Sequence, residues 1–142
     1  MDMREYLRNH RDPARLNEIL TLVIEGVQQI HNLGFVHRDL KPDNIILNLD
    51  PLEVRVIDFN RSLIDSTTSS GSIFGTPGYY PSATKWRDGS RKWDIWSLAA
   101  IILEADMDLD EYLHTRDERG ALSKFHQHSL HPHTCYPLRD LV

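Results

Sequence analysis

The chain has 142 residues, a length that suits one ordinary domain. Hydrophobic residues make up 40% of it and charged residues 26%, which is typical of a globular protein and not of a disordered chain. The formal net charge of -5 argues against a general nucleic-acid binder, which usually carries a basic patch. A single cysteine, Cys135, excludes a fold held together by internal disulfides.

Targeting and membrane signals are not found in this sequence. Residues 1–5 lack the apolar core of a signal peptide, and no run approaches the roughly 18 apolar residues of a membrane span. With one cysteine, a reducing compartment is the default. We therefore expect a cytoplasmic or nuclear protein that makes no contact with membranes or nucleic acids.

Two helices are predicted before residue 35. Residues 5–8 form the first, which is short. Asp12 then stands where an N-cap residue should, with Pro13 at the first helical position. Gly34 ends the second helix. Apolar residues recur between them at spacings of three and four, which predicts a core helix without chemistry of its own: Leu16, Ile19, Leu20, Val23, Ile24, Val27 and Ile30.

A dense polar segment follows at residues 37–44, with the sequence HRDLKPDN. Asp39 can accept a proton from a hydroxyl, and Lys41 can neutralise a transferring anion. Asn44 offers a carbonyl oxygen, which is a suitable ligand for Mg²⁺. Taken alone, the segment is also compatible with a solvated polar loop.

A β-hairpin is predicted next. Residues 45–47 form a short apolar strand, residues 48–51 a turn, and residues 54–59 a second strand rich in β-branched side chains. Asn44 immediately precedes the first strand and Asp58 closes the second. Antiparallel pairing would therefore bring both side chains within reach of one shared cation.

These segments resemble the eukaryotic protein kinases. Residues 37–44 match the family's catalytic loop HRDLxxxN at every fixed position, and residues 58–60 match its DFG metal motif except that Asn60 replaces the glycine. The resemblance covers about residues 1–105, expected to be a partial kinase domain, and leaves residues 106–142 as a divergent His-rich tail. It implies a mainly α fold, a protein-kinase-like C-lobe with a short β-hairpin that carries the catalytic and metal motifs.

The resemblance also implies a function, a Ser/Thr protein kinase that uses ATP and Mg²⁺ and acts on a protein substrate bearing Ser or Thr. Asp39 would orient or deprotonate the acceptor hydroxyl, and Lys41 would steady the γ-phosphate. Asn44 and Asp58 would hold the magnesium ions. Ile46 would contact the adenine from below. Lysine two residues after the aspartate is the pattern of the Ser/Thr branch.

Residues 65–72 form a hydroxyl-rich segment that is compatible with a flexible linker. In the kinase interpretation it is the activation loop. Phosphate on one of its hydroxyls, such as that of Thr67 or Thr68, would pair with Arg38, the arginine that precedes the catalytic aspartate.

Residues 75–83 resemble the family's substrate-binding segment GTPxY…APE. Thr76 falls where the Ser/Thr branch carries a hydroxyl that bonds the catalytic aspartate and lysine. Ala83 stands where the family has a glutamate that braces the lower lobe, so the resemblance is incomplete at this end.

Residues 93–103 are apolar nearly all round, which predicts a helix buried on every side. They resemble the family's central helix with the pattern DxWSLG. Asp94 is a carboxylate in this buried stretch and needs partners. By resemblance it caps the backbone of the catalytic loop, while His37 and Phe59 stack on this helix as structural supports.

The chain departs from the family at its front. It begins where the family's lower lobe begins, without the Gly-rich loop, the ATP-anchoring lysine or the glutamate that pairs with it. Two functions therefore stay open: a Ser/Thr kinase, of which this is the catalytic lower lobe, and a non-catalytic kinase remnant that docks partners. The surface that an upper lobe would cover is expected to be apolar and to favour association.

A third interpretation concerns the tail. Imidazole and thiolate groups suit zinc, although their spacing here matches no site that we can name. The candidate ligands are His126, His128, His131, His133 and Cys135. A solvated His-rich tail is the alternative.

Overall fold

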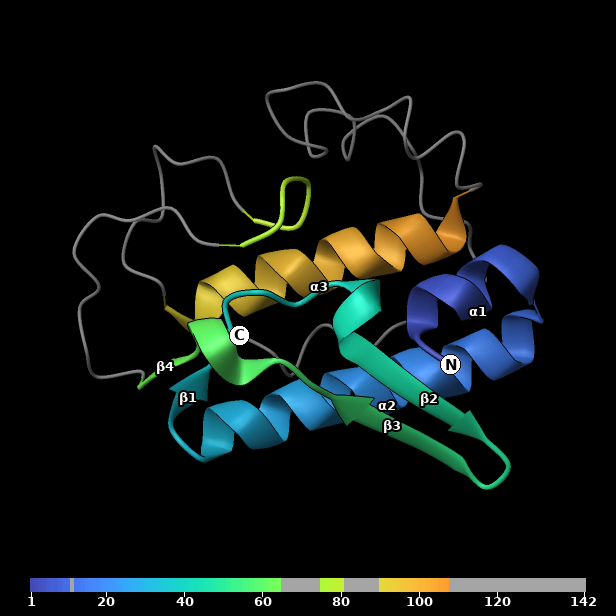
Figure 1. The fold of residues 1–142 in the computed structure, drawn as a ribbon, viewed down its shortest axis with the longest axis horizontal. Helices are drawn as coiled ribbons and strands as arrows, with labels where there is room; N and C mark the ends of the chain where they lie inside the picture. The colour runs from blue at the N-terminus through green and yellow to red at the C-terminus, as the bar shows by residue number, and fades with distance from the viewer. Residues whose placement is uncertain (11, 65–74, 81–89, 108–142) are drawn as a thin grey trace.

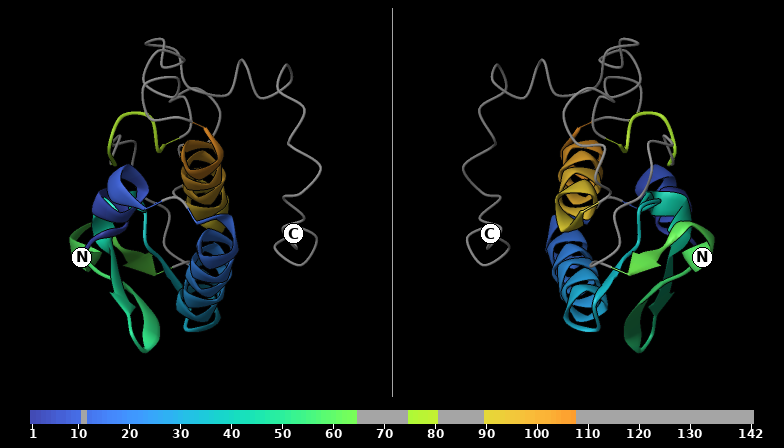
Figure 2. Two further views of the ribbon diagram at one scale, coloured as in Figure 1. Left: turned by 90° about the vertical axis from the view of Figure 1, so that its right-hand side faces the viewer. Right: turned by 90° about the vertical axis from the view of Figure 1, so that its left-hand side faces the viewer.

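Two long helices and a β-hairpin organise the fold. The computed structural model describes residues 1–10, 12–64, 75–80 and 90–107. Helix α2 lies beside α3, and the β2–β3 hairpin and α1 lie along one side of this helix pair (Figures 1 and 2). The described elements are α1 (Met3–Asn9), α2 (Pro13–Asn32), β1 (Phe35–Val36), η1 (Pro42–Asn44), β2 (Ile45–Leu49), β3 (Leu52–Val56), η2 (Phe59–Arg61), β4 (Leu63–Ile64) and α3 (Arg91–Asp106).

Helix α2 begins and ends where the sequence predicts. The side chain of Asp12 accepts a hydrogen bond from the backbone N–H of Ala14 at 3.1 Å, and Pro13 opens the helix. Gly34 has a φ of 82°, the left-handed conformation that closes a helix at little steric cost to glycine. This helix delivers the chain to the short strand β1, directly before the polar segment.

The hairpin is present, but its bounds differ from the prediction. Leu49 pairs with Leu52, so the turn contains only Asp50 and Pro51. Strand β3 ends at Val56 and not at residue 59, because Asp58 has left-handed backbone angles, φ 65° and ψ 68°, that cannot continue a strand. The prediction that Asp58 closes the second strand is therefore wrong by two residues.

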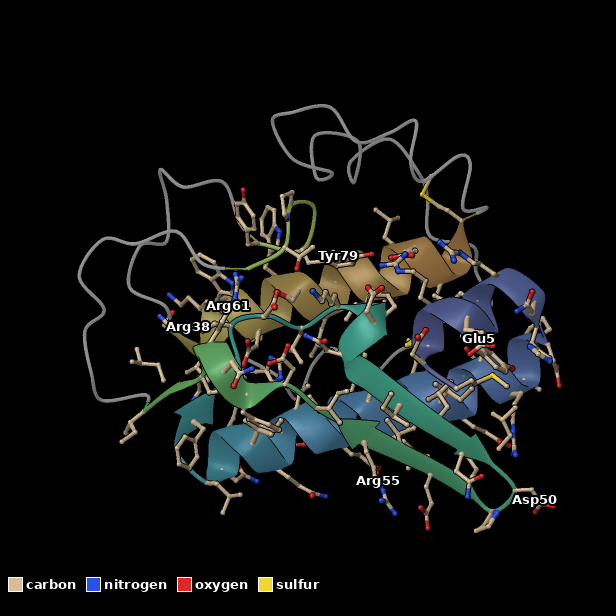
Figure 3. All side chains as sticks on the ribbon, in the orientation of Figure 1. Glu5, Arg38, Asp50, Arg55, Arg61 and Tyr79 are labelled. Carbon is tan, nitrogen blue, oxygen red and sulfur yellow. The ribbon has the colours of Figure 1, made fainter. Side chains whose placement is uncertain are left out.

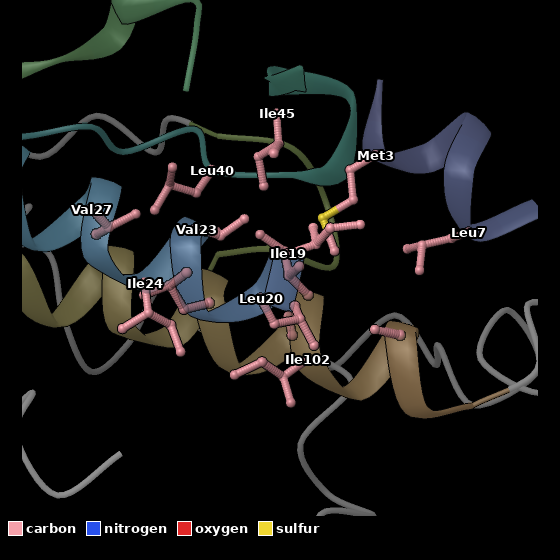
Figure 4. Close-up of a cluster of buried hydrophobic side chains, with 14 of the residues drawn as sticks. Met3, Leu7, Ile19, Leu20, Val23, Ile24, Val27, Leu40, Ile45 and Ile102 are labelled. Carbon is pink, nitrogen blue, oxygen red and sulfur yellow. The ribbon is translucent and has the colours of Figure 1, made fainter. Parts of the chain in front are cut away.

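The hydrophobic core joins all the larger elements (Figure 4). Buried side chains come from α1, α2, the hairpin and α3, for example Leu7, Val23, Ile45 and Ile101. Leu40, inside the polar segment, is 0% exposed and fixes that segment to the core. Burial of one such side chain contributes about 1.5–3 kcal/mol. The catalytic-loop candidate therefore rests on a rigid base.

Helix α3 is buried on most of its surface, as its apolar sequence predicts. Its buried residues include two carboxylates, Asp94 and Glu104. Burial of an ionised carboxylate is unfavourable unless it is paired and hydrogen-bonded, so these two residues mark the polar contacts that matter. No helix in the described part of the chain is long and apolar enough to cross a membrane.

Candidate active site

The start of the catalytic-loop segment is held by a buried carboxylate from α3. Asp94, 0% exposed, accepts hydrogen bonds from the backbone N–H of His37 at 2.7 Å and of Arg38 at 2.8 Å. Its Oδ2 also lies 2.8 Å from Nε2 of His31, in the last turn of α2. The buried charge is thus matched by three polar partners, which fix the path of the loop.

Arg38 has an unusual backbone conformation for a residue with a side chain. Its φ is 67°, a left-handed value that costs about 1–3 kcal/mol in a non-glycine residue. The hydrogen bond from its N–H to Asp94 helps to hold this conformation. Burial lowers the pKa of the Arg38 guanidinium, and the charge of Asp94 opposes that shift. Its Nε donates to the backbone oxygen of Arg61 at 2.6 Å.

Three of the predicted site residues meet at one carboxylate. The hydroxyl of Thr76 donates to Oδ1 of Asp39 at 2.9 Å and accepts from Nζ of Lys41 at 2.9 Å. Nζ of Lys41 also lies 3.7 Å from Oδ2 of Asp39. Asp39 is only 6% exposed. A buried carboxylate with one oxygen held by a threonine and a cation beside the other can orient a hydroxyl and accept its proton.

The backbone segments that carry the two predicted metal ligands lie side by side. The backbone oxygen of Asn44 accepts a hydrogen bond from the N–H of Ile57 at 2.9 Å, which places Asn44 opposite the residue before Asp58. Nδ2 of Asn44 donates to the backbone oxygen of Asp39 at 2.8 Å, so its carbonyl oxygen is the atom left for a cation. Asp58 is exposed. One amide oxygen and one carboxylate are a donor set that fits a hard divalent cation.

Ile46 lies in β2, one residue after the buried Ile45, and is half-buried. It lines a hollow of about 240 Å³ on the hairpin, together with Leu47, Asn48, Glu53 and Arg55. An apolar side chain at the edge of a hollow offers a surface on which a planar ring can pack.

The two predicted support residues touch each other. The rings of His37 and Phe59 meet edge to face, with centroids 4.9 Å apart and an angle of 64°. His37 is 0% exposed, whereas Phe59 is 47% exposed. Nε2 of His37 lies 2.9 Å from the backbone oxygen of Ile57. The connection of this pair to α3 runs through Asp94, which holds the backbone of His37.

A second, partly buried polar network contains residues that sequence analysis did not single out. Arg4 of α1 lies 3.0 Å from the carboxylate of Asp43, 2.6 Å from Glu104 and 2.7 Å from the hydroxyl of Tyr79. The Tyr79 hydroxyl also donates to Glu104. Burial alone disfavours the charge of Arg4, but the contacts with Tyr79, Glu104 and Asp43 outweigh it and raise the pKa of Arg4.

One signal for this network was present in the sequence. Glu104 is a carboxylate in an otherwise apolar helix, as Asp94 is, and the same need for partners applies to both. Its partner Arg4 is 100 residues away, and no local pattern links the two.

Residues 75–80 are held against α3 by a hydrogen bond to Tyr79. Oγ of Ser97 donates to the backbone oxygen of Tyr79 at 2.5 Å, and the N–H of Tyr79 donates to the backbone oxygen of Thr76 at 3.0 Å. Figure 3 shows Tyr79 beside α3. Thr76, which donates to Asp39, is therefore held in place by α3 through Tyr79.

Other predicted residues lie outside the described parts of the chain. These are Thr67, Thr68 and Ala83 of the activation and substrate segments, and the histidines and Cys135 of the tail. Within the residues that the structure describes, no group of three or more His, Cys, Asp or Glu side chains is arranged to hold a metal ion. The zinc interpretation of the tail stays a prediction.

Comparison with known protein families identifies the class of protein to which this chain belongs. The family model of the protein kinase domain matches residues 2–134, so the chain belongs to the protein kinase family. This match continues past residue 105, into the segment predicted to be a divergent tail. The boundary between the two parts stays a prediction.

Among its relatives are Ser/Thr kinases. The chain is 33% identical over 109 residues to the probable serine/threonine-protein kinase fnkB of Dictyostelium discoideum, which covers 72% of this chain and 21% of that protein. It is 36% identical to the serine/threonine-protein kinase pakA of Talaromyces marneffei, over 57% of this chain and 13% of that protein. It is 39% identical to the human calcium/calmodulin-dependent protein kinase type 1B, over 56% of this chain and 24% of that protein. The chain thus spans about a quarter or less of each of these relatives.

Proposed function

We propose that the chain takes part in ATP-dependent phosphoryl transfer to Ser or Thr residues of a protein substrate. The observation that carries this proposal is the arrangement at Asp39, where the Thr76 hydroxyl bonds Oδ1 and also accepts from Lys41. A structural carboxylate would have both oxygens satisfied by hydrogen bonds. Among the described residues, Oδ2 has cations at 3.7 and 3.8 Å, beyond hydrogen-bonding distance, and so would be able to accept a substrate hydroxyl.

The protein's part in this reaction is to position groups and to neutralise charge. Asp39 would accept the hydrogen bond of the acceptor hydroxyl at Oδ2 and take its proton as the new O–P bond forms. The bond between the γ-phosphorus and the β–γ bridging oxygen of ATP breaks in the same step, and ADP is the leaving group. Thr76 keeps Oδ1 occupied, so the carboxylate has one orientation. Lys41, between Thr76 and Asp39, places its positive charge where the transferring phosphoryl group would arrive.

The metal-binding half of the site would be formed by Asn44 and Asp58. Magnesium bound there would neutralise the charge on the phosphates. Asn44 is oriented for this role by its bond to the backbone oxygen of Asp39, which also couples the metal ligand to the catalytic loop. Ile46 would lie against the adenine ring. Asn60, in place of the family's glycine, leaves the ligand Asp58 unchanged.

The test is transfer of the γ-phosphate of ATP to peptides. The purified chain is incubated with Mg·ATP and a library of Ser- and Thr-containing peptides, and phosphopeptides are detected by mass spectrometry. We expect phosphopeptides with the wild-type chain and with the control variant Asp106→Asn, which changes an exposed carboxylate at the end of α3. We expect none above background with Asp39→Asn. Wild-type transfer no greater than that of Asp39→Asn would refute the proposal.

A second function, partner docking without catalysis, is favoured by one observation. Ile57 is 40% exposed and Phe59 47% exposed, on either side of the metal-ligand candidate Asp58. Exposed apolar side chains beside a polar site favour contact with another protein segment. This function predicts a cooperatively folded chain that shows no heat of binding when titrated with Mg·ATP. Saturable binding that Asp58→Asn abolishes would exclude it.

A further inference from the structure

A guanidinium that the proposed reaction does not use lies beside the catalytic carboxylate. Arg61 is the last residue of η2, the short helix that begins directly after Asp58. Its Nε is 3.8 Å from Oδ2 of Asp39, and its side chain is 45% exposed. Its Nη1 donates to the backbone oxygen of Gly75 at 3.2 Å. One side chain thus reaches both the catalytic carboxylate and the residue before Thr76.

The two oxygens of Asp39 have different surroundings. Oδ1 accepts the hydrogen bond of Thr76, whereas Oδ2 faces Lys41 and Arg61 at 3.7 and 3.8 Å. At these distances the cations attract the oxygen electrostatically without using its hydrogen-bonding capacity. The pair of cations therefore holds Oδ2 on the side of Lys41 and Arg61, and leaves that oxygen able to accept a hydroxyl.

The backbone of Arg61 is held as well. Its carbonyl oxygen accepts the 2.6 Å hydrogen bond from Nε of Arg38, the residue before Asp39, and the two arginines lie side by side (Figure 3). Gly75 approaches the same loop so closely that a Cβ on it would lie 3.2 Å from the backbone oxygen of Arg38. Arg61 therefore joins η2, the catalytic loop and residues 75–80 at one point.

Resting on the proposed function, we propose that Arg61 is a positioning residue for phosphoryl transfer. Its guanidinium keeps Oδ2 of Asp39 directed at the acceptor hydroxyl. Its hydrogen bond to Gly75 keeps Thr76 against Oδ1. Because η2 follows Asp58 directly, Arg61 also connects the turn that carries the proposed metal ligand Asp58 to Asp39, which would bind the acceptor hydroxyl.

The test compares three variants of the full chain. Arg61→Met removes the charge and the donors but keeps much of the side-chain length, whereas Arg61→Lys keeps the charge but cannot bond Gly75 and face Asp39 with one planar group. Arg8→Met is the matched control, because Arg8 is exposed in the last turn of α1. The readouts are kcat, the KM values for peptide and for Mg·ATP, and hydrogen exchange of the Tyr79 amide, which donates to Thr76.

We expect Arg61→Met to lower kcat about tenfold, the effect of a modest loss of transition-state positioning, with the KM for Mg·ATP unchanged. We expect the Tyr79 amide to exchange faster in this variant, and Arg61→Lys to lie between it and wild type. If Arg61→Met does not fold, Arg61→Lys carries the test with a smaller fall in kcat.

Two outcomes would overturn the inference and can be told apart. A wild-type chain that transfers phosphate, with Arg61 variants matching Arg8→Met in kcat and in amide exchange, would refute the role of Arg61 alone. A wild-type chain that transfers no phosphate would refute the proposed function, and the role of Arg61 in that reaction with it.

Discussion

Replacement of Asp94 is the substitution whose effect the structure defines most closely. The carboxylate is 0% exposed, its Oδ1 accepts from the N–H of Arg38, and its Oδ2 accepts from the N–H of His37 and faces His31. Asparagine has the same shape but only one acceptor oxygen. In either orientation of its amide, the NH₂ group faces a backbone N–H, and one buried donor loses its partner.

The magnitude follows from this geometry. One unsatisfied buried donor costs about 1–3 kcal/mol, which is the expected loss for Asp94→Asn. Asp94→Ala leaves the backbone N–H groups of His37 and Arg38 unsatisfied at once and creates a cavity, so we expect a loss of about 2–6 kcal/mol, twice the cost of one unsatisfied donor. Domains of this kind have about 5–15 kcal/mol of stability in total. The alanine variant is therefore expected to be at the margin of folding.

The assay is urea unfolding followed by the fluorescence of Trp93 and Trp96, which flank Asp94 on the same helix. A lower midpoint with an unchanged m-value is expected for Asp94→Asn. Asp106→Asn, at the exposed end of α3, is the control and should lie within about 0.5 kcal/mol of wild type. An Asp94→Asn variant as stable as this control would refute the view that Asp94 holds the loop.

Three further predictions follow from the site and the core. Thr76→Val should lower phosphoryl transfer about tenfold in steady-state assays without changing the KM for Mg·ATP, because Asp39 loses the hydrogen bond that orients it. Arg4→Ala should destabilise the chain by about 3–5 kcal/mol in urea unfolding, since it leaves Glu104 as a buried charge without its cation, and a second change, Glu104→Gln, should recover part of that loss. Burial, with the charge of Asp12, raises the pKa of Tyr6 above 10.0. The stability that the protonated Tyr6 hydroxyl contributes is complete below pH 10.0 and is lost as the pH rises through the folded-state pKa. The free energy of unfolding of Tyr6→Phe, measured against pH, should therefore lack this fall at alkaline pH.

The elements with a local sequence signal were the ones that could be predicted. The spacing of apolar residues, the cap at Asp12 and the glycine at 34 locate helix α2, because each depends on neighbours within one or two turns. The hairpin was expected for the same reason. Its second strand was predicted too long because β-branched residues continue to Ile57, whereas the backbone turns at Asp58.

The contacts between distant segments could be predicted only in part. Asp94 was expected to need partners because it interrupts an apolar helix, and resemblance to the kinases suggested which ones. The pairing of Arg4 with Glu104, and the approach of Arg61 to Asp39, depend on how separate elements pack against each other. No spacing in the sequence encodes them, and they emerge only from the folded chain.

The measurement that tests the central claim most directly is the rate of γ-phosphate transfer from Mg·ATP to a Ser/Thr peptide by the wild-type chain and by Asp39→Asn. General-base groups contribute about 10²–10⁴-fold to such rates. The arrangement of Asp39, Lys41 and Thr76 predicts measurable wild-type transfer and a fall of at least about a hundredfold in the variant. Equal rates for the two proteins, or no transfer by either, would contradict it.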